Sequence, residues 1–219
     1  HGESDAPLWS FSLDQYADDV AALLDHLNIP QAVLVGLSMG GYVSLAFSRT
    51  YGKRLLGLVL ADTRAQADSP DGRTGRFHLA QTAYTQGTET VANTMLPKLL
   101  GATSLNNKPE LVESIRRTIH QAPVSGILVD LMAMADRRDS TTHLSAILCP
   151  TLVVIGEEDH TTPLVDAQLM AERIPHARLA IIPAAGHVSN CEQPELFNDL
   201  LRGFVEELRS RAGEPSFRL

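Results

Sequence analysis

Four short apolar runs, each bounded by Gly, Pro or polar residues, constrain the fold more than any other feature of this chain. They span residues 32–36, 55–61, 151–156 and 178–182. Short, mostly apolar runs of this kind are typical of strands that a parallel sheet buries on both faces. Helical patterns accompany them at 13–28, 40–51, 164–174 and 194–211. Because parallel strands need crossover connections, this alternation predicts an α/β fold, a mostly parallel sheet flanked by helices.

The stretch 64–146 breaks the alternation and holds no convincing strand. Its helical segments, separated by Gly87, Gly101 and Pro123, lie near 73–86, 88–100, 109–121 and 124–137. We expect an all-helical cap inserted at 64–146, reached through a turn-rich hinge at 68–72. The core domain is then formed by residues 1–63 together with 147–219.

Composition and charge exclude several classes of protein. The 219 residues are 44% hydrophobic and 20% charged, which is too apolar for a disordered chain. A net charge of −8 argues against nucleic acid or an anionic membrane as the main partner. No apolar run approaches the ~20 residues of a membrane helix, and no signal-peptide pattern opens the chain. We therefore expect a cytoplasmic protein.

The two cysteines, Cys149 and Cys191, predict neither a disulfide framework nor a metal site. Two cysteines are too few for such a framework in a chain of this length. Their spacing from each other and from the histidines does not match that of a zinc site. We expect two reduced thiols and no metal.

The motif Gly36-Leu37-Ser38-Met39-Gly40-Gly41 follows the first apolar run and precedes a helical pattern. In that context G-x-S-x-G is typical of a nucleophile elbow, a sharp and strained turn from strand to helix. We expect Gly36 and Gly40 to lie too close to neighbouring backbone to carry a Cβ, with Gly41 as a further close-packing position. The turn presents the Ser38 hydroxyl at the carboxyl end of the strand. It also directs the Met39 N–H toward a developing oxyanion.

A serine hydroxyl is a weak nucleophile unless a base lies beside it. Of the eight histidines, His187 is the candidate base, because it follows the run 178–182 directly, at a carboxyl end of the sheet. His176 has the context of a surface loop. His160 follows Asp159 in a loop and could line the site.

The base needs a carboxylate that orients its ring. Asp159, which follows the run 151–156, is the first candidate, and Glu157, Glu158 and Asp62 remain alternatives. Asp159 precedes His187 by 28 residues, room for one helix and one strand, so both loops reach the same edge of the sheet. The order serine, acid, histidine is that of α/β-hydrolases.

Three motifs together resemble the α/β-hydrolase superfamily: the elbow 36–41, the acid loop 156–159 and the closing motif Gly186-His187-Val188-Ser189-Asn190-Cys191-Glu192-Gln193-Pro194. Within it the chain is most similar to small bacterial carboxylesterases, enol-lactonases and cofactor-free haloperoxidase relatives. The resemblance implies a Ser38-His187-Asp159 triad that cleaves small-molecule carboxylic esters through an acyl-enzyme, with no cofactor. Two alternatives stay open with the same triad, lactone opening and cofactor-free perhydrolysis.

The resemblance departs from the family at the front of the chain. Residues 1–7 are similar to the loop that family members place after their fourth strand, and the N-terminal strands before that loop are absent. The His-Gly loop that supplies a second oxyanion donor is absent too. The run 32–36 is then expected to form an exposed sheet edge. The chain would be a fragment of a longer hydrolase, or a homo-oligomer joined through that edge, or a chain whose N-terminal segment supplies a substitute donor. A catalytically impaired fragment or binding module is the remaining alternative.

Overall fold

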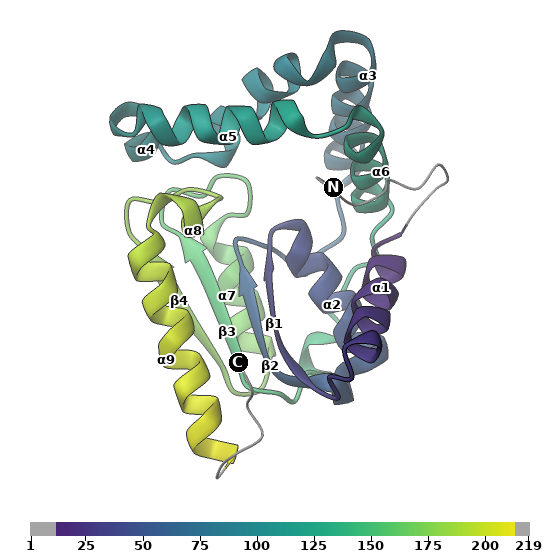
Figure 1. Cartoon of the computed structure of the whole chain (residues 1–219), viewed down its shortest axis with the longest axis vertical. Helices are drawn as coiled ribbons and strands as arrows, with labels where there is room; N and C mark the ends of the chain where they lie inside the picture. The colour runs from purple at the N-terminus through teal and green to yellow at the C-terminus, as the bar shows by residue number, and fades with distance from the viewer. Residues whose placement is uncertain (1–11, 213–219) are drawn as a thin grey trace.

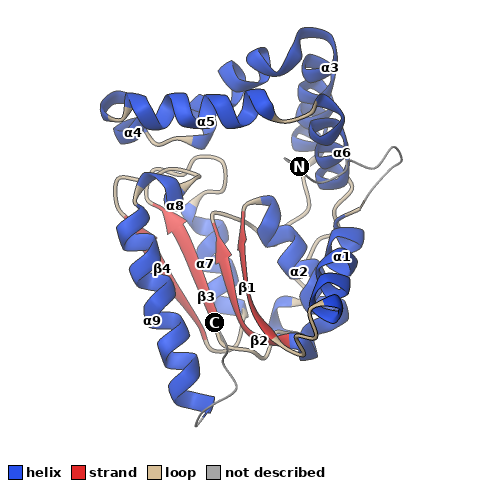
Figure 2. Ribbon diagram, in the orientation of Figure 1, coloured by secondary structure: helices blue, strands red, loops and turns tan. Residues whose placement is uncertain are grey.

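A computed structural model describes residues 12–212 and shows a parallel sheet between two layers of helices (Figures 1 and 2). The strands are β1 (Ala32–Leu37), β2 (Leu55–Ala61), β3 (Thr151–Gly156) and β4 (Ala177–Ile182). They lie in the order β1-β2-β3-β4, and every neighbouring pair is parallel. The predicted α/β fold is confirmed, and the carboxyl ends of all four strands meet at one edge of the sheet.

Helices cover both faces of this sheet. They are α1 (Leu13–His26), α2 (Met39–Tyr51), α7 (Leu164–Arg173), the short α8 (Ser189–Glu192) and α9 (Pro194–Ala212), with 3₁₀ turns at Gly52–Arg54 and Leu144–Ala146. Phe204 and Leu208 of α9 pack against Val59 and Val154 on one face. On the other face α7 and α2 pack against β2 and β3, and α1 packs on α2. Ser12 begins α1 with the predicted capping box to Gln15.

A helical insertion lies between β2 and β3, over the carboxyl ends of the strands (Figure 1). Its helices are α3 (Pro70–Leu99), α4 (Ala102–Asn107), α5 (Pro109–Gln121) and α6 (Val124–Ala135). Gly87, at φ 80°, breaks α3 where the sequence predicts a boundary. Two features differ from expectation. The helix begins at Pro70, inside the predicted hinge, because Ser69 caps it. The six-residue α4 is too short to leave a periodic pattern.

The segments that lead into and out of the insertion are tied to each other and to α2. Arg137 forms an ion pair with Asp68 at 2.7 Å and lies 4.2 Å from the ring centre of Tyr42. The N–H of Ser140 donates to the carbonyl oxygen of Ala65 at 2.8 Å. The insertion is therefore anchored on the helix that begins directly after Ser38.

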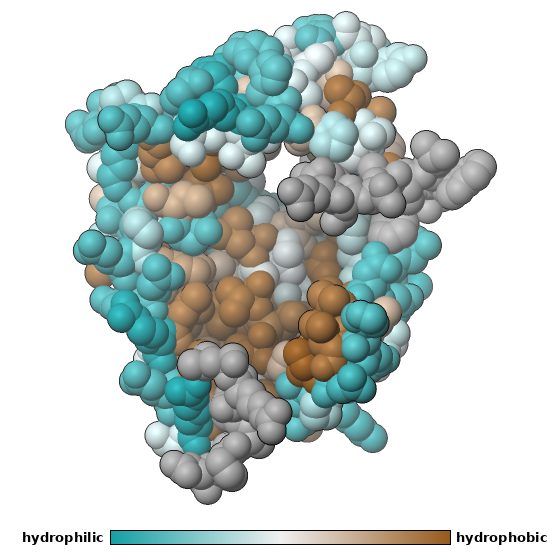
Figure 3. Space-filling view, in the orientation of Figure 1, coloured by the Kyte–Doolittle hydropathy of each residue, from teal (hydrophilic) through white to brown (hydrophobic). Residues whose placement is uncertain are grey.

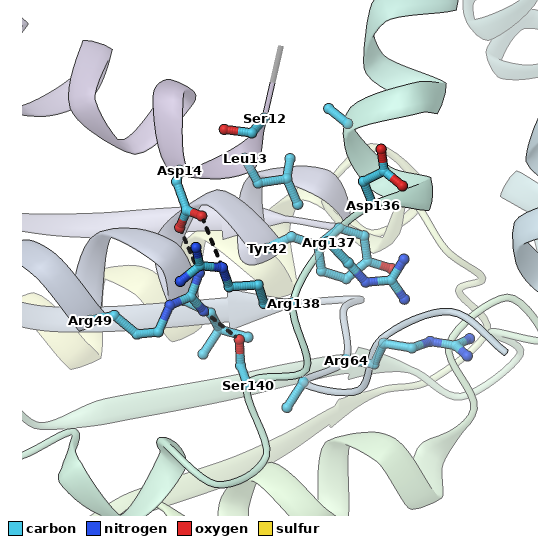
Figure 4. Close-up of a pocket in the computed structure, with 13 residues that line it drawn as sticks. Ser12, Leu13, Asp14, Tyr42, Arg49, Arg64, Asp136, Arg137, Arg138 and Ser140 are labelled. Atoms are coloured by element: carbon cyan, nitrogen blue, oxygen red, sulfur yellow. Dashed lines mark hydrogen bonds and ion pairs between the residues drawn. The ribbon is translucent and has the colours of Figure 1, made fainter. Parts of the chain in front are cut away.

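A cavity of about 270 Å³ lies beside this anchor, between α1, α2 and the loop that follows α6 (Figure 4). Arginines dominate its polar lining, but each is already engaged. Arg49 bonds Asp14 and Ser140, and Arg138 pairs with the same Asp14. Because these arginines bind residues of the junction itself, we assign this cavity to the junction and not to catalysis.

The strand β1 forms one edge of the described sheet. Val33, Val35 and Leu37 share one face of this strand, and Val35 is 48% exposed. Figure 3 shows apolar surface over the sheet between α9 and α1. This exposed edge agrees with the expectation, and the homo-oligomer built on it stays a prediction. Among residues 12–212, no helix is long and apolar enough to cross a membrane.

The end of β2 carries a carboxylate that joins three segments of the chain. Asp62 is fully buried and accepts hydrogen bonds from the Gly156 N–H at 2.8 Å and the Ser189 hydroxyl at 2.5 Å. Burial raises the pKa of Asp62 to about 7, although the bonds from Ser189 and Gly156 oppose the shift. Asp62 thereby links β2 to β3 and to the segment that follows His187.

We expect this carboxyl group to make stability depend on pH. Because its pKa is higher in the folded chain than in the unfolded chain, folding takes up a proton between about pH 4 and pH 7. The stabilisation is complete below that window and is lost as pH rises through 7. The Asp62→Asn variant should lack this effect. The difference in unfolding free energy, wild type minus variant, should fall by on the order of 3 kcal/mol between pH 4 and 8 in urea titrations. A difference independent of pH would contradict the assignment.

Candidate active site

Ser38 occupies the turn between β1 and α2 with a strained backbone, at φ 52° and ψ −114°. A positive φ is costly for a residue with a side chain, so such strain persists only where the surroundings enforce it. The Ser38 N–H donates to the carbonyl oxygen of Ala61 at 2.9 Å, and the Thr63 hydroxyl donates to the Ser38 carbonyl oxygen at 2.8 Å. These two bonds hold the elbow against the end of β2.

The glycines of the elbow act partly as predicted. A Cβ at Gly36 would lie 2.3 Å from the Gly40 carbonyl oxygen, and one at Gly41 would lie 2.5 Å from the side chain of Thr63. Both positions therefore exclude a side chain. The same prediction for Gly40 is wrong, because nothing lies within 4 Å of a Cβ there. Gly40 contributes its backbone to the crowding around Gly36, while its own α-carbon faces open space.

The structure brings Ser38, His187 and Asp159 together at the carboxyl edge of the sheet. His187 Nε2 lies 2.7 Å from Ser38 Oγ, and His187 Nδ1 lies 2.9 Å from Asp159 Oδ2. His187 is 2% exposed and Asp159 5%. The three side chains come from the loops after β1, β3 and β4, so parallel strand order alone places them at one rim.

The Asp159 carboxylate is held by four donors. Besides His187, it accepts the Thr161 N–H at 2.7 Å, the Thr162 N–H at 3.0 Å and the Thr162 hydroxyl at 2.5 Å. Burial alone would raise the pKa of Asp159, but the hydrogen bond and charge of His187, with the bonds from Thr162, hold it below its ordinary value. Asp159 therefore stays ionised near neutral pH. The sequence does not single out Thr161 and Thr162, although an aspartate side chain often accepts the backbone N–H groups of the residues two and three positions after it.

The other candidate acids bind elsewhere. Glu157 is exposed and accepts the Ala184 N–H at 3.3 Å, whereas Glu158 binds Thr103 of the insertion. Asp62 reaches Ser189 but forms no hydrogen bond with the imidazole among the described contacts.

The structure also describes three further residues that the sequence singles out, His160, His176 and Met39. The side chain of His160 is exposed, and His176 lies in a turn at φ 63°. Met39 is the first residue of α2, so its N–H has no acceptor within the helix. The residues 1–7, on which the question of a second oxyanion donor rests, lie outside the described residues.

This geometry suits proton transfer from an alcohol. A neutral imidazole whose Nδ1–H donates to an ionised carboxylate presents a lone pair at Nε2, and here Nε2 is within hydrogen-bond reach of a hydroxyl. A hydroxyl, an imidazole and a carboxylate thus follow one another in a hydrogen-bond chain at one rim of the sheet.

Comparisons with known proteins show which enzymes this chain is similar to. The 3-oxoadipate enol-lactonase 2 of Acinetobacter baylyi is 33% identical over 206 residues, which are 94% of this chain and 75% of that protein. The structure of a thermophilic esterase from Thermogutta terrifontis has 40% identity and a TM-score of 0.91, covering 94% of this chain and 76% of that one. The enol-lactonase from Burkholderia xenovorans LB400 has 28% identity and a TM-score of 0.87, covering 94% and 77%.

A family model described as alpha/beta hydrolase fold matches residues 1–194. That match takes in the elbow, the acid loop and the closing motif, in the order that the fold requires. The chain belongs to the α/β-hydrolase fold family.

Proposed function

We propose that this protein is a serine hydrolase that cleaves carboxylic esters through Ser38, His187 and Asp159. The observation that carries the proposal is the unbroken hydrogen-bond chain from Ser38 Oγ through the imidazole to Asp159. A histidine packed for purely structural reasons has no need of a strained serine on one side and an ionised, four-donor carboxylate on the other.

The reaction follows from the positions of these groups. Ser38 Oγ attacks the acyl carbonyl while His187 Nε2 takes its proton, and the Met39 N–H stabilises the oxyanion that forms. His187 then protonates the departing alcohol as the ester C–O bond breaks. Water attacks the acyl-enzyme with His187 again as base, which releases the acid and restores the Ser38 hydroxyl. All these steps use groups of the chain itself and call for no metal or organic cofactor.

Lactone opening is the second candidate, and the enol-lactonases among the relatives favour it. A lactone is a cyclic ester, so the same nucleophile and base open it, and the leaving alkoxide remains attached to the acyl group. Perhydrolysis differs only in that peroxide replaces water as the second nucleophile. The esterase with 40% identity supports the acyclic ester as the first choice. The intact hydrogen-bond chain argues against an impaired binding module.

Replacement of the nucleophile should abolish turnover. We expect Ser38→Ala to lower kcat for p-nitrophenyl acetate by at least ~10³-fold, because among residues 12–212 no other hydroxyl bonds His187 Nε2. The same variant should not react with a fluorophosphonate probe, which labels activated serines. Ser48→Ala is the matched control, since this serine lies on the same helix and its hydroxyl donates to the local Leu45 carbonyl oxygen at 2.8 Å. An active Ser38→Ala variant would remove the mechanism.

The two buried aspartates at this rim should differ sharply in their effect on rate. Asp159→Asn should lower kcat by on the order of 10⁴-fold, because an amide at this position favours the wrong imidazole tautomer. Asp62→Asn should retain at least a hundred times more activity than that variant, because its amide can still pair with Gly156 and Ser189. Steady-state kinetics with p-nitrophenyl esters would measure both. Equal losses in the two variants would mean that Asp159 is not the orienting acid.

The substrate class can be settled with three assays on one preparation. We expect p-nitrophenyl esters, tested as a chain-length series, to be cleaved with higher kcat/KM than simple lactones. Halide oxidation in acetate and peroxide should be a minor activity. Ser38→Ala should abolish all three activities, which ties them to one site. Fast lactone opening together with inert acyclic esters would instead select the second candidate.

A further inference from the structure

A second buried carboxylate, which the mechanism does not use, bridges the helical insertion and the base. Glu192 ends α8 and is fully buried. Its Oε1 accepts the Gly186 N–H at 2.7 Å, and its Oε2 accepts the Gly101 N–H at 2.8 Å. Gly186 directly precedes His187, whereas Gly101 lies at the junction between α3 and α4. One carboxylate thus binds the insertion with one oxygen and the His187 segment with the other.

The three backbones at this contact are packed too closely for side chains. A Cβ at Gly186 would lie 2.3 Å from the Gly101 nitrogen, and a Cβ at Gly156 would lie 2.1 Å from the Gly186 carbonyl oxygen. A Cβ at Gly101 would lie 2.4 Å from Glu158 Oε2. The insertion, the His187 segment and the acid loop therefore touch through glycine backbone, where a displacement of one cannot be absorbed by side-chain rotation.

Further contacts hold the same junction. The Val188 N–H donates to the Leu99 carbonyl oxygen at 3.2 Å, and the Thr103 N–H donates to Glu158 Oε2 at 2.9 Å. Lys108, which follows α4, donates from Nζ to the backbone carbonyl oxygen of Glu192. Glu158, which precedes Asp159, and Val188, which follows His187, are thus bound to the start of α4 and the end of α3.

From these contacts we infer that Glu192 is a positioning residue, which couples the seating of the α3–α4 junction to the position of the His187 imidazole. The inference rests on the proposed function, in which His187 Nε2 takes the Ser38 proton across 2.7 Å. A shift at Gly186 is transmitted through one peptide unit to His187. Displacement of a catalytic group by about 1 Å can cost on the order of 10²-fold in rate.

The test is Glu192→Gln, which keeps the volume of the side chain but has one accepting oxygen. Whichever way the amide is turned, its NH₂ group faces either the Gly101 or the Gly186 N–H, so one buried donor loses its acceptor. The matched control is Glu157→Gln, the same change at an exposed residue of the acid loop. The control should behave as wild type.

Labelling by a fluorophosphonate probe gives two separate numbers, the fraction of protein that reacts and the rate constant of that fraction. If Glu192 positions His187, Glu192→Gln should label almost completely but ten- to a hundredfold more slowly than wild type. If Glu192 only stabilises the fold, part of the protein should fail to label and the remainder should react at the wild-type rate. That second result would overturn the inference.

Hydrogen exchange tests the coupling without any activity. Exchange at peptides that cover 99–103 and 186–189 should be faster in both segments of Glu192→Gln and unchanged in Glu157→Gln. Faster exchange in only one segment, or in neither, would overturn the coupling. A wild-type protein that does not label would refute the proposed function, yet this measurement would still decide whether Glu192 joins the two segments.

Lys108→Met serves if Glu192→Gln is recovered unfolded. Lys108 is half-buried, and the substitution removes the hydrogen bond from its Nζ to the Glu192 carbonyl oxygen. Because the donor itself is removed, no buried donor is left unpaired. A two- to fivefold slower labelling rate with full labelling would support the coupling. An unchanged rate would count against it.

Discussion

The strained backbone at Ser38 is the constraint on which the rest of the site depends. A non-glycine residue at positive φ costs on the order of 1–3 kcal/mol and persists only where its neighbours enforce it. Here the Ala61 carbonyl oxygen and the Thr63 hydroxyl bind the Ser38 backbone, so the elbow is fastened to the neighbouring strand. A side chain at Gly41 would clash with Thr63 and push the turn away from that strand, and one at Gly36 would clash with Gly40 within the turn. The pairing of β1 with β2 therefore fixes the orientation of the Ser38 hydroxyl.

Parallel strands explain how residues far apart in sequence meet Ser38. Three loops start at one rim, but a shared rim alone does not bring side chains within hydrogen-bond distance, as His187 Nε2 and Ser38 Oγ are at 2.7 Å. Buried carboxylates supply the remaining precision by accepting N–H groups from the loops. Asp62 accepts hydrogen bonds from Gly156, at the end of β3, and from Ser189, at the start of α8. Asp159 accepts the N–H groups of Thr161 and Thr162 in its own loop. A buried carboxyl group that accepts several donors makes a loop rigid without occupying the site.

The sequence predicts the local features of this protein well, and it predicts the long-range contacts poorly. The observed strands match the predicted runs to within one residue, because a buried parallel strand must be apolar along its length. The elbow, His187 and Asp159 are found because each directly follows a strand. In contrast, Gly40 is misjudged, and Glu192 is not singled out. The space around a glycine and the partner of a buried glutamate depend on segments up to about ninety residues away, and no local pattern records them.

The difference between backbone contacts and side-chain contacts also matters for how the insertion relates to Ser38, His187 and Asp159. Two of the contacts between the insertion and the loops that carry Asp159 and His187 use the backbone N–H groups of Gly101 and Thr103, which donate to two glutamates. A backbone donor is present whatever side chains the insertion carries elsewhere. The helix α5, none of whose residues is fully buried, can thus change its apolar side chains without altering those two contacts. Side chains of the insertion can then vary, while the geometry of Ser38, His187 and Asp159 is held by contacts that the variation does not reach.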